Sequence, residues 1–399
     1  MKRILLLGGS AQQVGIIKKA KEMGCYTIVC DYLLDNPGQY VADKFYLVST
    51  TEKEKVLEVA EKEKIDAVLA YASDPAAPTA AYIAERLNLS GNPYASIEIL
   101  CNKEKFRRFL KENGFNSPEA NDYTDVGHIL EDCKNGKIDF PVIVKPVDSS
   151  GSKGAMVLKS DEEIEKAAEL AFSFSRCHKI IIEKYIEKKH RYLVGGDIFV
   201  NEGKIVVWGL LNCHRDSNVN PLVPAGKSYP LQISDSDQKK IKVVLQSLVN
   251  KLHIRTGAMN IEAIIDESNR VWLIDVGPRS GGNMIPDLLG YIYNIDIAEI
   301  SIKAALGEEI DILPQKSQYC YATYNIHSEL DGQYKGVIVS EDIKKYVVRK
   351  CLYKRDGDKV ERFDNASKCL GIIFMRFESE EIMNNVLKSI NEKIQVQLK

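Results

Sequence analysis

Two carboxylates, Glu262 and Asp275, stand in neighbouring β-forming runs and could together hold a divalent cation. The runs read MNIEAIID and RVWLIDV, and the polar tetrad ESNR separates them. This pattern predicts a hairpin, which would fold the two carboxylates back towards each other. Two carboxylates brought together in apolar strands repel and are costly to bury. Mg²⁺ removes that cost, and nucleotide sites bind it with one or two carboxylates and with phosphates.

The turn after the second run, residues 277–283, could let an anion approach the backbone closely. It reads GPRSGGN, so one fixed cation, Arg279, stands among several small residues. The alternative interpretation is a structural hairpin in which Glu262 and Asp275 are solvated residues at a sheet edge. These residues by themselves leave both interpretations open.

A second group that could bind phosphate surrounds Lys145, near the end of the apolar run PVIVKP. A lysine in such a strand needs a partner for its charge. The loop SSGSKG at residues 149–154 follows, and its small residues would let backbone N–H groups face an anion. The loop is not a Walker A motif, because no Gly-Lys-Ser/Thr opens a helix. The alternative is a flexible hairpin.

Length and composition narrow the class of protein. A chain of 399 residues should form more than one compact unit. The net charge of −2 gives no basic excess for nucleic acid, and no Lys-rich stretch suggests a membrane-binding tail. The apolar run at residues 4–7 is too short for a signal peptide or a spanning helix. Nine scattered cysteines without a Cys-x-x-Cys pair fit reduced thiols. We therefore expect a cytoplasmic protein without nucleic-acid or membrane partners.

The elements that must position these residues begin with alternating strands and helices over residues 1 to about 100. Strands separated by helices predict a parallel sheet covered on both faces. The turn at residues 8–10 and Asp31 loosely resemble a dinucleotide-binding fingerprint. The G-x-G-x-x-G spacing is absent, however, so a structural strand-to-helix turn is the favoured interpretation.

The middle of the chain mixes the two kinds of element. Asn102-Lys103 opens a helix that Gly114 ends, and the strand KIIIEKYI emerges into residues 183–186. The runs YLVGGDIFV and KIVVWGLL predict two further strands, and residues 213–230 read as a long loop. A helix from Asp235 to about Leu252 precedes the hairpin. From about residue 317 the chain is β-rich, and residues 379–394 predict a closing helix.

Taken in order, these motifs resemble the ATP-grasp superfamily of carboxylate–amine ligases, over essentially the whole chain. The motifs are Asn-Lys before a helix, PVIVKP, SSGSKG, IEKYI, Asn-x-Glu and LIDVGPR. The superfamily includes carbamoyl-phosphate synthase large chains, amino-acid ligases and phosphoribosylglycinamide synthetases. The resemblance implies an α/β and α+β fold with four parts. These are a Rossmann-like preATP-grasp domain at 1–100, a small lobe with a glycine-rich lid at 101–187, a large lobe with the Mg site at 188–312, and a β-rich C-terminal subdomain at 313–399.

The resemblance also implies a role for each motif, with ATP and Mg²⁺ as cofactors. Glu262 and Asp275 would hold Mg²⁺ on the phosphates, Glu183 would accept from the adenine amino group, and Arg279 would hold the substrate carboxylate or the phosphate formed on it. Lys145 would act on the transferred phosphate. The residues expected around the nucleotide are Lys103, Lys145, Ser149, Ser150, Gly151, Ser152, Gly154, Glu183, Lys184, Tyr185 and Ile186, with residues 149–154 as a mobile lid.

Two positions depart from the family's pattern. The family often has Asn two residues after the second metal carboxylate, where this chain has Gly277. The metal site would then rely on bidentate Asp275, on Asn260 or on water. The family also commonly places an acid for the ribose hydroxyls where the register here gives Leu193. The nearest polar substitutes are Glu187, His190 and Arg191.

The implied activity is ATP-dependent ligation of a small carboxylate to an amine through an acyl phosphate, with release of ADP and phosphate. His214, Arg215, Lys227 and Asn283 are candidates for contacting the substrates, and the alternative for the loop that carries the first three is an ordinary charged surface. Two other functions stay open. One is a purine-pathway enzyme acting on a ribonucleotide, and the other is a degenerate, non-catalytic nucleotide-binding protein. The resemblance also makes a homodimer possible.

Overall fold

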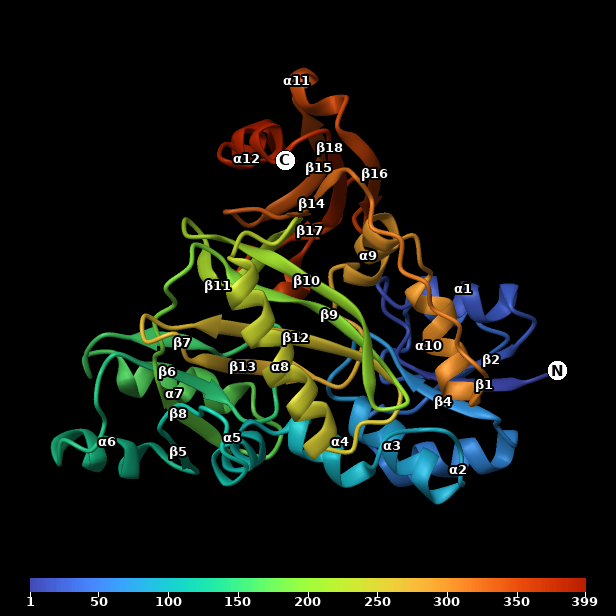
Figure 1. Ribbon diagram of the computed structural model, residues 1–399, viewed down its shortest axis with the longest axis horizontal. Coiled ribbons are helices and arrows are strands. Elements are labelled where there is room, and N and C mark those ends of the chain that lie inside the picture. Colours follow the sequence, from blue (N-terminus) through green and yellow to red (C-terminus); the bar gives the residue numbers. More distant parts are fainter.

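The computed structural model describes residues 1–399 and contains four β-sheets. In Figure 1 an eight-stranded sheet runs through the centre of the molecule. The N-terminal domain, in blue, and the small lobe, in green, lie at opposite sides of its lower part, and the C-terminal part, in orange and red, projects from its upper end. The α/β and α+β fold class predicted from the sequence is confirmed.

The N-terminal sheet is parallel, as its alternating pattern predicted, with the order β3-β2-β1-β4. Its strands are β1 (Arg3–Leu7), β2 (Tyr26–Asp31), β3 (Lys44–Leu47) and β4 (Ala67–Ala70). The helices of this region are α1 (Val14–Glu22), α2 (Lys53–Glu63), α3 (Ala77–Arg86) and α4 (Tyr94–Cys101). The sequence pattern missed the edge strand β3 and helix α4.

The small lobe is an antiparallel sheet of order β5-β8-β6-β7. It comprises β5 (Ala120–Tyr123), β6 (Val142–Pro146), β7 (Met156–Leu158) and β8 (Ile180–Lys184), with helices α5 (Lys103–Glu112), α6 (Val126–Lys134) and α7 (Ile164–Ser173). Side chains alternate along β6. Val142 and Val144 enter the lobe's apolar core, whereas Ile143 and Lys145 line a cavity on the other face.

The central sheet has the order β13-β12-β9-β10-β11-β14-β18-β16. Its first five strands are β9 (Leu193–Asn201), β10 (Lys204–Asp216), β11 (Asn220–Tyr229), β12 (Gly257–Ile265) and β13 (Val271–Gly277). Helix α8 (Asp235–Lys251) packs apolar side chains on one face, and α9 (Ile285–Tyr293) covers the other. Helix α10 (Ile297–Leu306) follows.

The C-terminal part continues the same sheet, because β14 pairs with β11. The added strands are β14 (Cys320–Ile326), β16 (Val347–Leu352) and β18 (Gly371–Phe377). A smaller sheet consists of β15 (Gly332–Val339), β17 (Lys359–Val360) and β19 (Ile394–Leu398), with helices α11 (Glu341–Lys344), α12 (Glu380–Leu387) and α13 (Ile390–Lys393) beside it. The single closing helix predicted over 379–394 is therefore two short helices, and strand β19 follows them.

The prediction of a long loop over residues 213–230 is wrong, because most of this segment is strand. Strand β10 runs on to Asp216, and β11 returns beside it after a short turn. The sequence suggested a loop because Pro221 and Pro224 fall within the segment. Proline cannot donate to a sheet ladder and is tolerated at bulges. Pro224 lies where the register between β10 and β11 shifts, beside Arg215.

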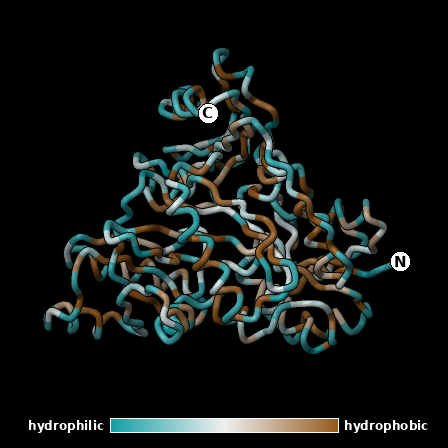
Figure 2. Tube along the Cα trace, in the orientation of Figure 1, coloured by the Kyte–Doolittle hydropathy of each residue, from teal (hydrophilic) through white to brown (hydrophobic).

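Hydrophobic residues are frequent in the inner strands and helices, and many of the outer turns are hydrophilic (Figure 2). The largest buried cluster joins the N-terminal sheet, helices α3, α4 and α5, and the face of the central sheet that α8 covers. Helix α5 contributes Phe106 and Leu110 to it and is thereby fixed against the large lobe. No helix combines the length and the apolar character that crossing a membrane requires.

Candidate functional site

A cavity of about 530 Å³ lies between the small lobe and the central sheet. Fourteen of the eighteen residues predicted to bind the nucleotide, the metal or the substrates line it: Lys103, Lys145, Ser149, Ser150, Gly151, Ser152, Glu183, Lys184, Tyr185, Ile186, His214, Arg215, Glu262 and Asp275. Gly154, Lys227, Arg279 and Asn283 do not line it. The fold therefore gathers most of the predicted nucleotide and metal residues around one space.

Glu262 and Asp275 are direct partners in the antiparallel register of β12 and β13. Each carboxylate also has a cation near it, which offsets the repulsion expected between them. Arg215 Nη2 lies 3.0 Å from Glu262 Oε1, and Lys103 Nζ lies 4.0 Å from Asp275 Oδ1. Burial raises the pKa of Asp275, but the charges of Lys103 and the other nearby cations outweigh it, so the pKa is lowered.

The donor set at this pair fits a hard cation that takes further ligands from phosphates and water. No group of three or more His, Cys, Asp or Glu side chains forms a complete metal cage anywhere in the chain. The Asp275 side chain is 44% exposed and faces the cavity, so a cation held there would remain open to a nucleotide.

The structure gives a physical reason for glycine at position 277. A Cβ on Gly277 would lie 2.5 Å from Asp74 Oδ1 and 3.2 Å from Arg279 Cζ. An asparagine would therefore collide with the Asp74–Arg279 ion pair. Asn260, considered above as a substitute ligand, donates from its amide nitrogen to Gly196 O at 3.0 Å and to Asp197 Oδ1 at 2.8 Å.

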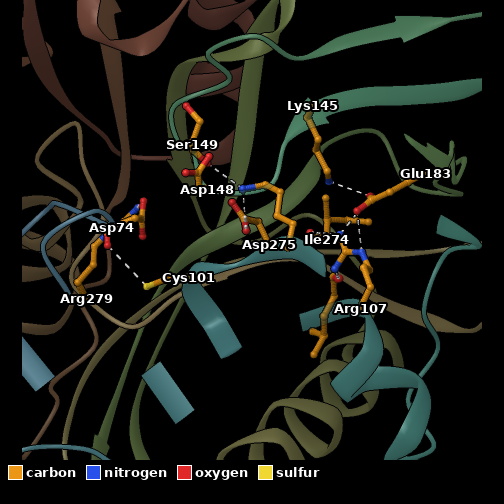
Figure 3. A network of polar contacts seen from close by, with 12 residues as sticks. Asp74, Cys101, Arg107, Lys145, Asp148, Ser149, Glu183, Ile274, Asp275 and Arg279 are labelled. Atoms are coloured by element: carbon orange, nitrogen blue, oxygen red, sulfur yellow. Dashed lines mark hydrogen bonds and ion pairs between the residues drawn. The ribbon is translucent and has the colours of Figure 1, made fainter. Parts of the chain in front are cut away.

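Lys145 belongs to a buried group of three charged side chains (Figure 3). Its Nζ lies 2.8 Å from Glu183 Oε2, and Arg107 Nε donates to Glu183 Oε1 at 3.0 Å. Burial lowers the pKa of Lys145, and Glu183 opposes that effect. Burial raises the pKa of Glu183, but the charges of Arg107 and Lys145 outweigh it and hold this pKa at about 2. Glu183 is thus an ionised carboxylate that orients Lys145, in addition to its predicted contact with adenine.

The Asn-Lys motif is a helix start that aims a cation into the cavity. The side chain of Asn102 accepts from Lys105 N at 3.0 Å and so caps α5. Lys103 follows as the first helical residue, and its Nζ donates to Ser149 O at 2.8 Å. Lys103 consequently touches the glycine-rich loop while it faces Asp275.

The glycine-rich loop lies closed over the cavity and is tied at two further points. Ser152 Oγ donates to Leu222 O at 3.0 Å on β11, and Ala366 N donates to Gly151 O at 3.2 Å. Gly151 and Gly154 have φ values of +66° and +70°, which favour glycine. A Cβ on Gly154 would lie 3.0 Å from the Phe174 ring, so this residue packs on α7 and not on the cavity.

The end of the cavity predicted for adenine and ribose contains Tyr185, Ile186, Arg191, Tyr192 and Leu193. Of the polar substitutes for a ribose acid, only Arg191 lines the cavity. His190 Nε2 instead accepts from Ile265 N at 3.0 Å. Lys184 Nζ donates to Phe140 O at 3.1 Å, so its ammonium group is bound within the small lobe.

The four candidates for substrate contact are divided between the cavity and its surroundings. Arg215 lines it beside Glu262. His214 also lines it, and burial and the charge of Lys227 lower the pKa of His214 to about 4, so the ring is neutral near pH 7. Lys227 is buried, with its Nζ 2.6 Å from Cys213 Sγ. Asn283 N donates to Gln12 Oε1 at 2.7 Å and joins the large lobe to the N-terminal domain.

Arg279 also joins domains in this structure. Its guanidinium pairs with Asp74 of the N-terminal domain and donates to Ser280 O at 3.1 Å, while its buried Nε has no partner. That unsatisfied donor suits one oxygen of a bound anion. Its assignment to a substrate carboxylate remains a prediction.

Three charged side chains that contact the predicted site residues or the turn after them were missed from the sequence: Arg107, Asp74 and Asp197. Arg107 follows Lys103 by one helical turn, and this spacing puts both residues on one face of α5. The spacing could have indicated that Arg107 lies near the site. Asp197 accepts from Gly281 N at 2.8 Å and thereby holds the turn after Arg279. Burial raises the pKa of Asp197 to about 6, although Asn260 and Gly281 oppose the shift. No local pattern marked Asp74 or Asp197, because their partners are distant in sequence.

Comparisons with known proteins agree with this geometry. Residues 138–287 match the family described as ATP-grasp domain. The carbamoyl phosphate synthase large chain of Clostridium botulinum (strain Loch Maree / Type A3) is 24% identical over 333 residues, which cover 78% of this chain and 30% of that protein. The chain thus spans less than a third of the length of that relative.

Solved structures share the fold over the whole chain. The L-amino acid ligase from Bacillus licheniformis superposes with a TM-score of 0.82 at 20% identity, covering 100% of this chain and 99% of that one. The phosphoribosylglycinamide synthetase from Anaerococcus prevotii superposes with a TM-score of 0.76 at 23% identity, covering 100% of both chains. The cofactor prediction is confirmed at the level of the family, whose enzymes use ATP and Mg²⁺. Residues 138–287 of the chain therefore form an ATP-grasp domain.

Proposed function

We propose that this protein is an ATP-dependent ligase that activates a small carboxylate as an acyl phosphate and joins it to an amine. The observation that carries the proposal is the juxtaposition of Glu262 and Asp275 with Lys103 and Lys145 around one cavity. Two facing carboxylates and two cations suit phosphoryl transfer, which needs charge stabilisation and positioning and no nucleophilic side chain.

In the proposed reaction, a carboxylate oxygen of the substrate attacks the γ-phosphorus of ATP, and the bond between that phosphorus and the β–γ bridging oxygen breaks. ADP leaves, and an acyl phosphate remains. The amine nitrogen then attacks the acyl carbon, loses a proton, and releases phosphate as the amide forms. Every oxygen of the released phosphate comes from ATP except one, which comes from the carboxylate.

In this scheme the side chains of the protein bind the nucleotide and the substrate and hold them in position. Lys145, fixed by Glu183, and Lys103 would neutralise the phosphates, and the loop at residues 149–154 would exclude water from the acyl phosphate. Glu262 and Asp275 would hold Mg²⁺, which supplies charge neutralisation at the transferred phosphate when bound. Arg279, which does not line the cavity in this structure, would hold the substrate carboxylate once its ion pair with Asp74 opens.

A purine-pathway reaction on a ribonucleotide is the second candidate, and the fold shared with a phosphoribosylglycinamide synthetase favours it. The test is a screen for ADP release with pooled small carboxylates and amines, including phosphoribosyl amines, followed by mass spectrometry of the products. ADP release that requires both a carboxylate and an amine without a phosphoribosyl group supports the ligase. Release only with a ribonucleotide supports the second candidate, and nucleotide binding without turnover in any pool would contradict both.

A further inference from the structure

Arg107 contacts both halves of the proposed nucleotide site, although it lies outside the cavity wall. In the small lobe its Nε donates to Glu183 Oε1 at 3.0 Å, and its Nη2 lies 3.3 Å from Glu183 Oε2. In the large lobe its Nη1 donates to Leu273 O at 3.2 Å, and its Nη2 donates to Ile274 O at 2.5 Å. The side chain is only 4% exposed, so each of these contacts is shielded from water.

These contacts connect Arg107 to the neighbours of both groups expected to act on the same phosphates, Lys145 and Asp275 (Figure 3). Glu183, its partner in the small lobe, holds Lys145 Nζ at 2.8 Å. Ile274, its partner in the large lobe, immediately precedes Asp275 on β13. Lys103, one helical turn before Arg107, approaches Asp275 from the same face of α5. The guanidinium of Arg107 thus links Glu183, which holds Lys145, to the strand that carries Asp275.

We propose that Arg107 is a positioning residue that sets the separation between Lys145 in the small lobe and Asp275 in the large lobe. The proposal rests on the proposed function, in which both groups act on the nucleotide phosphates. Arginine suits this role because its planar fork makes several hydrogen bonds in fixed directions. A lysine at this position would keep the buried charge but could not reach the carboxylate and both carbonyls with one fixed geometry.

The test compares the binding of ADP in excess Mg²⁺ with the binding of ADP in EDTA, by calorimetry, for the wild-type chain and Arg107→Lys. The dissociation constant in EDTA divided by the dissociation constant in Mg²⁺ measures how strongly Mg²⁺ and ADP favour each other's binding. In Arg107→Lys we expect this ratio to fall about tenfold, the scale of a lost hydrogen bond to a charged group. Arg108→Lys, on the exposed side of the same helix, should keep the wild-type ratio.

A second variant pair tests whether Arg107 acts through Lys145. In EDTA, Arg107→Lys should weaken ADP binding in the wild-type background and add less than twofold in a Lys145→Ala background. A purely structural effect of Arg107→Lys would raise the dissociation constants of ADP in Mg²⁺ and in EDTA by the same factor. Their ratio would then stay unchanged, which would overturn the proposal. An Arg107→Lys variant without a cooperative unfolding transition would also overturn it, since Arg107 would then be needed for the fold. If the wild-type chain binds no ADP, the proposed function itself fails.

Discussion

Glu262 and Asp275 face each other across β12 and β13, and each also faces a cation from another element, Arg215 on β10 and Lys103 on α5. The charges of the site are therefore nearly balanced before any metal binds. A cation such as Mg²⁺ would replace interactions that the carboxylates already make with Arg215 and Lys103. Because both carboxylates are partly exposed, the fold should tolerate loss of their charge.

The variant with Glu262→Gln and Asp275→Asn should therefore fold normally and lose Mg²⁺-dependent nucleotide binding. Both carboxylates are partly exposed, so we expect the free energy of unfolding without ligand to change by less than about 1 kcal/mol. In the wild-type chain MgADP should raise the melting temperature, and in the variant this rise should vanish. Thermal unfolding with and without MgADP checks both statements. A variant that MgADP still stabilises as strongly as the wild type would refute the metal assignment.

The hairpin of β12 and β13 could be predicted from the sequence because its two β runs and its polar turn are local patterns. The observed pairing of the two strands agrees with them. The strand β11 was missed because Pro221 and Pro224 argued against a strand, and only the partner β10 shows that a bulge accommodates Pro224. Arg107 and Asp74 were missed for a different reason. Their partners, Glu183 and Arg279, are distant in sequence, and the one local signal was the helical spacing from Lys103 to Arg107.

Lys145→Ala should weaken MgADP binding tenfold or more, because it removes a buried cation expected to contact phosphate. Glu183 would retain Arg107 as a partner, so the folded state should survive with a moderate loss of stability. Lys134→Ala, in the exposed part of the same lobe, is the control. Calorimetric titration with MgADP gives the result, and wild-type affinity in Lys145→Ala would show that this ammonium does not reach the nucleotide.

Asp197 should make stability fall as pH rises from about 4 to about 6. Its pKa is about 6 in the folded chain and about 3.9 in an unfolded one, so the folded state binds more protons within this window. Asp197→Asn removes this titration and keeps an oxygen that can accept from Gly281 N. Relative to the wild type, the variant should gain up to about 3 kcal/mol of unfolding free energy between pH 4 and pH 7.

Urea unfolding at several pH values measures the effect, with the exposed Asp311→Asn as the control. If the stability difference between Asp197→Asn and the wild type is the same at pH 4 and pH 7, Asp197 does not titrate in this window.

The loop at residues 149–154 should be cleaved by protease more slowly when MgADP is bound. Its closed position depends on a few hydrogen bonds, including Lys103 to Ser149 O and Ser152 to Leu222 O, and a bound phosphate would add more. Replacing Gly151 and Gly154 with Val should prevent closure, since both have positive φ and a Cβ at 154 would crowd Phe174. Limited proteolysis with and without MgADP is the measurement. Equal cleavage rates in both states of the wild type would mean that this loop is not a lid.

The acyl phosphate is the central claim, and transfer of oxygen isotope tests it most directly. Once the screen has identified a carboxylate and an amine, the carboxylate is labelled with ¹⁸O in both oxygens and the released phosphate is examined by mass spectrometry. Attack of a carboxylate oxygen on the γ-phosphorus predicts one ¹⁸O atom in each phosphate for each amide formed. Amide formation with no ¹⁸O in the phosphate would contradict the proposed reaction.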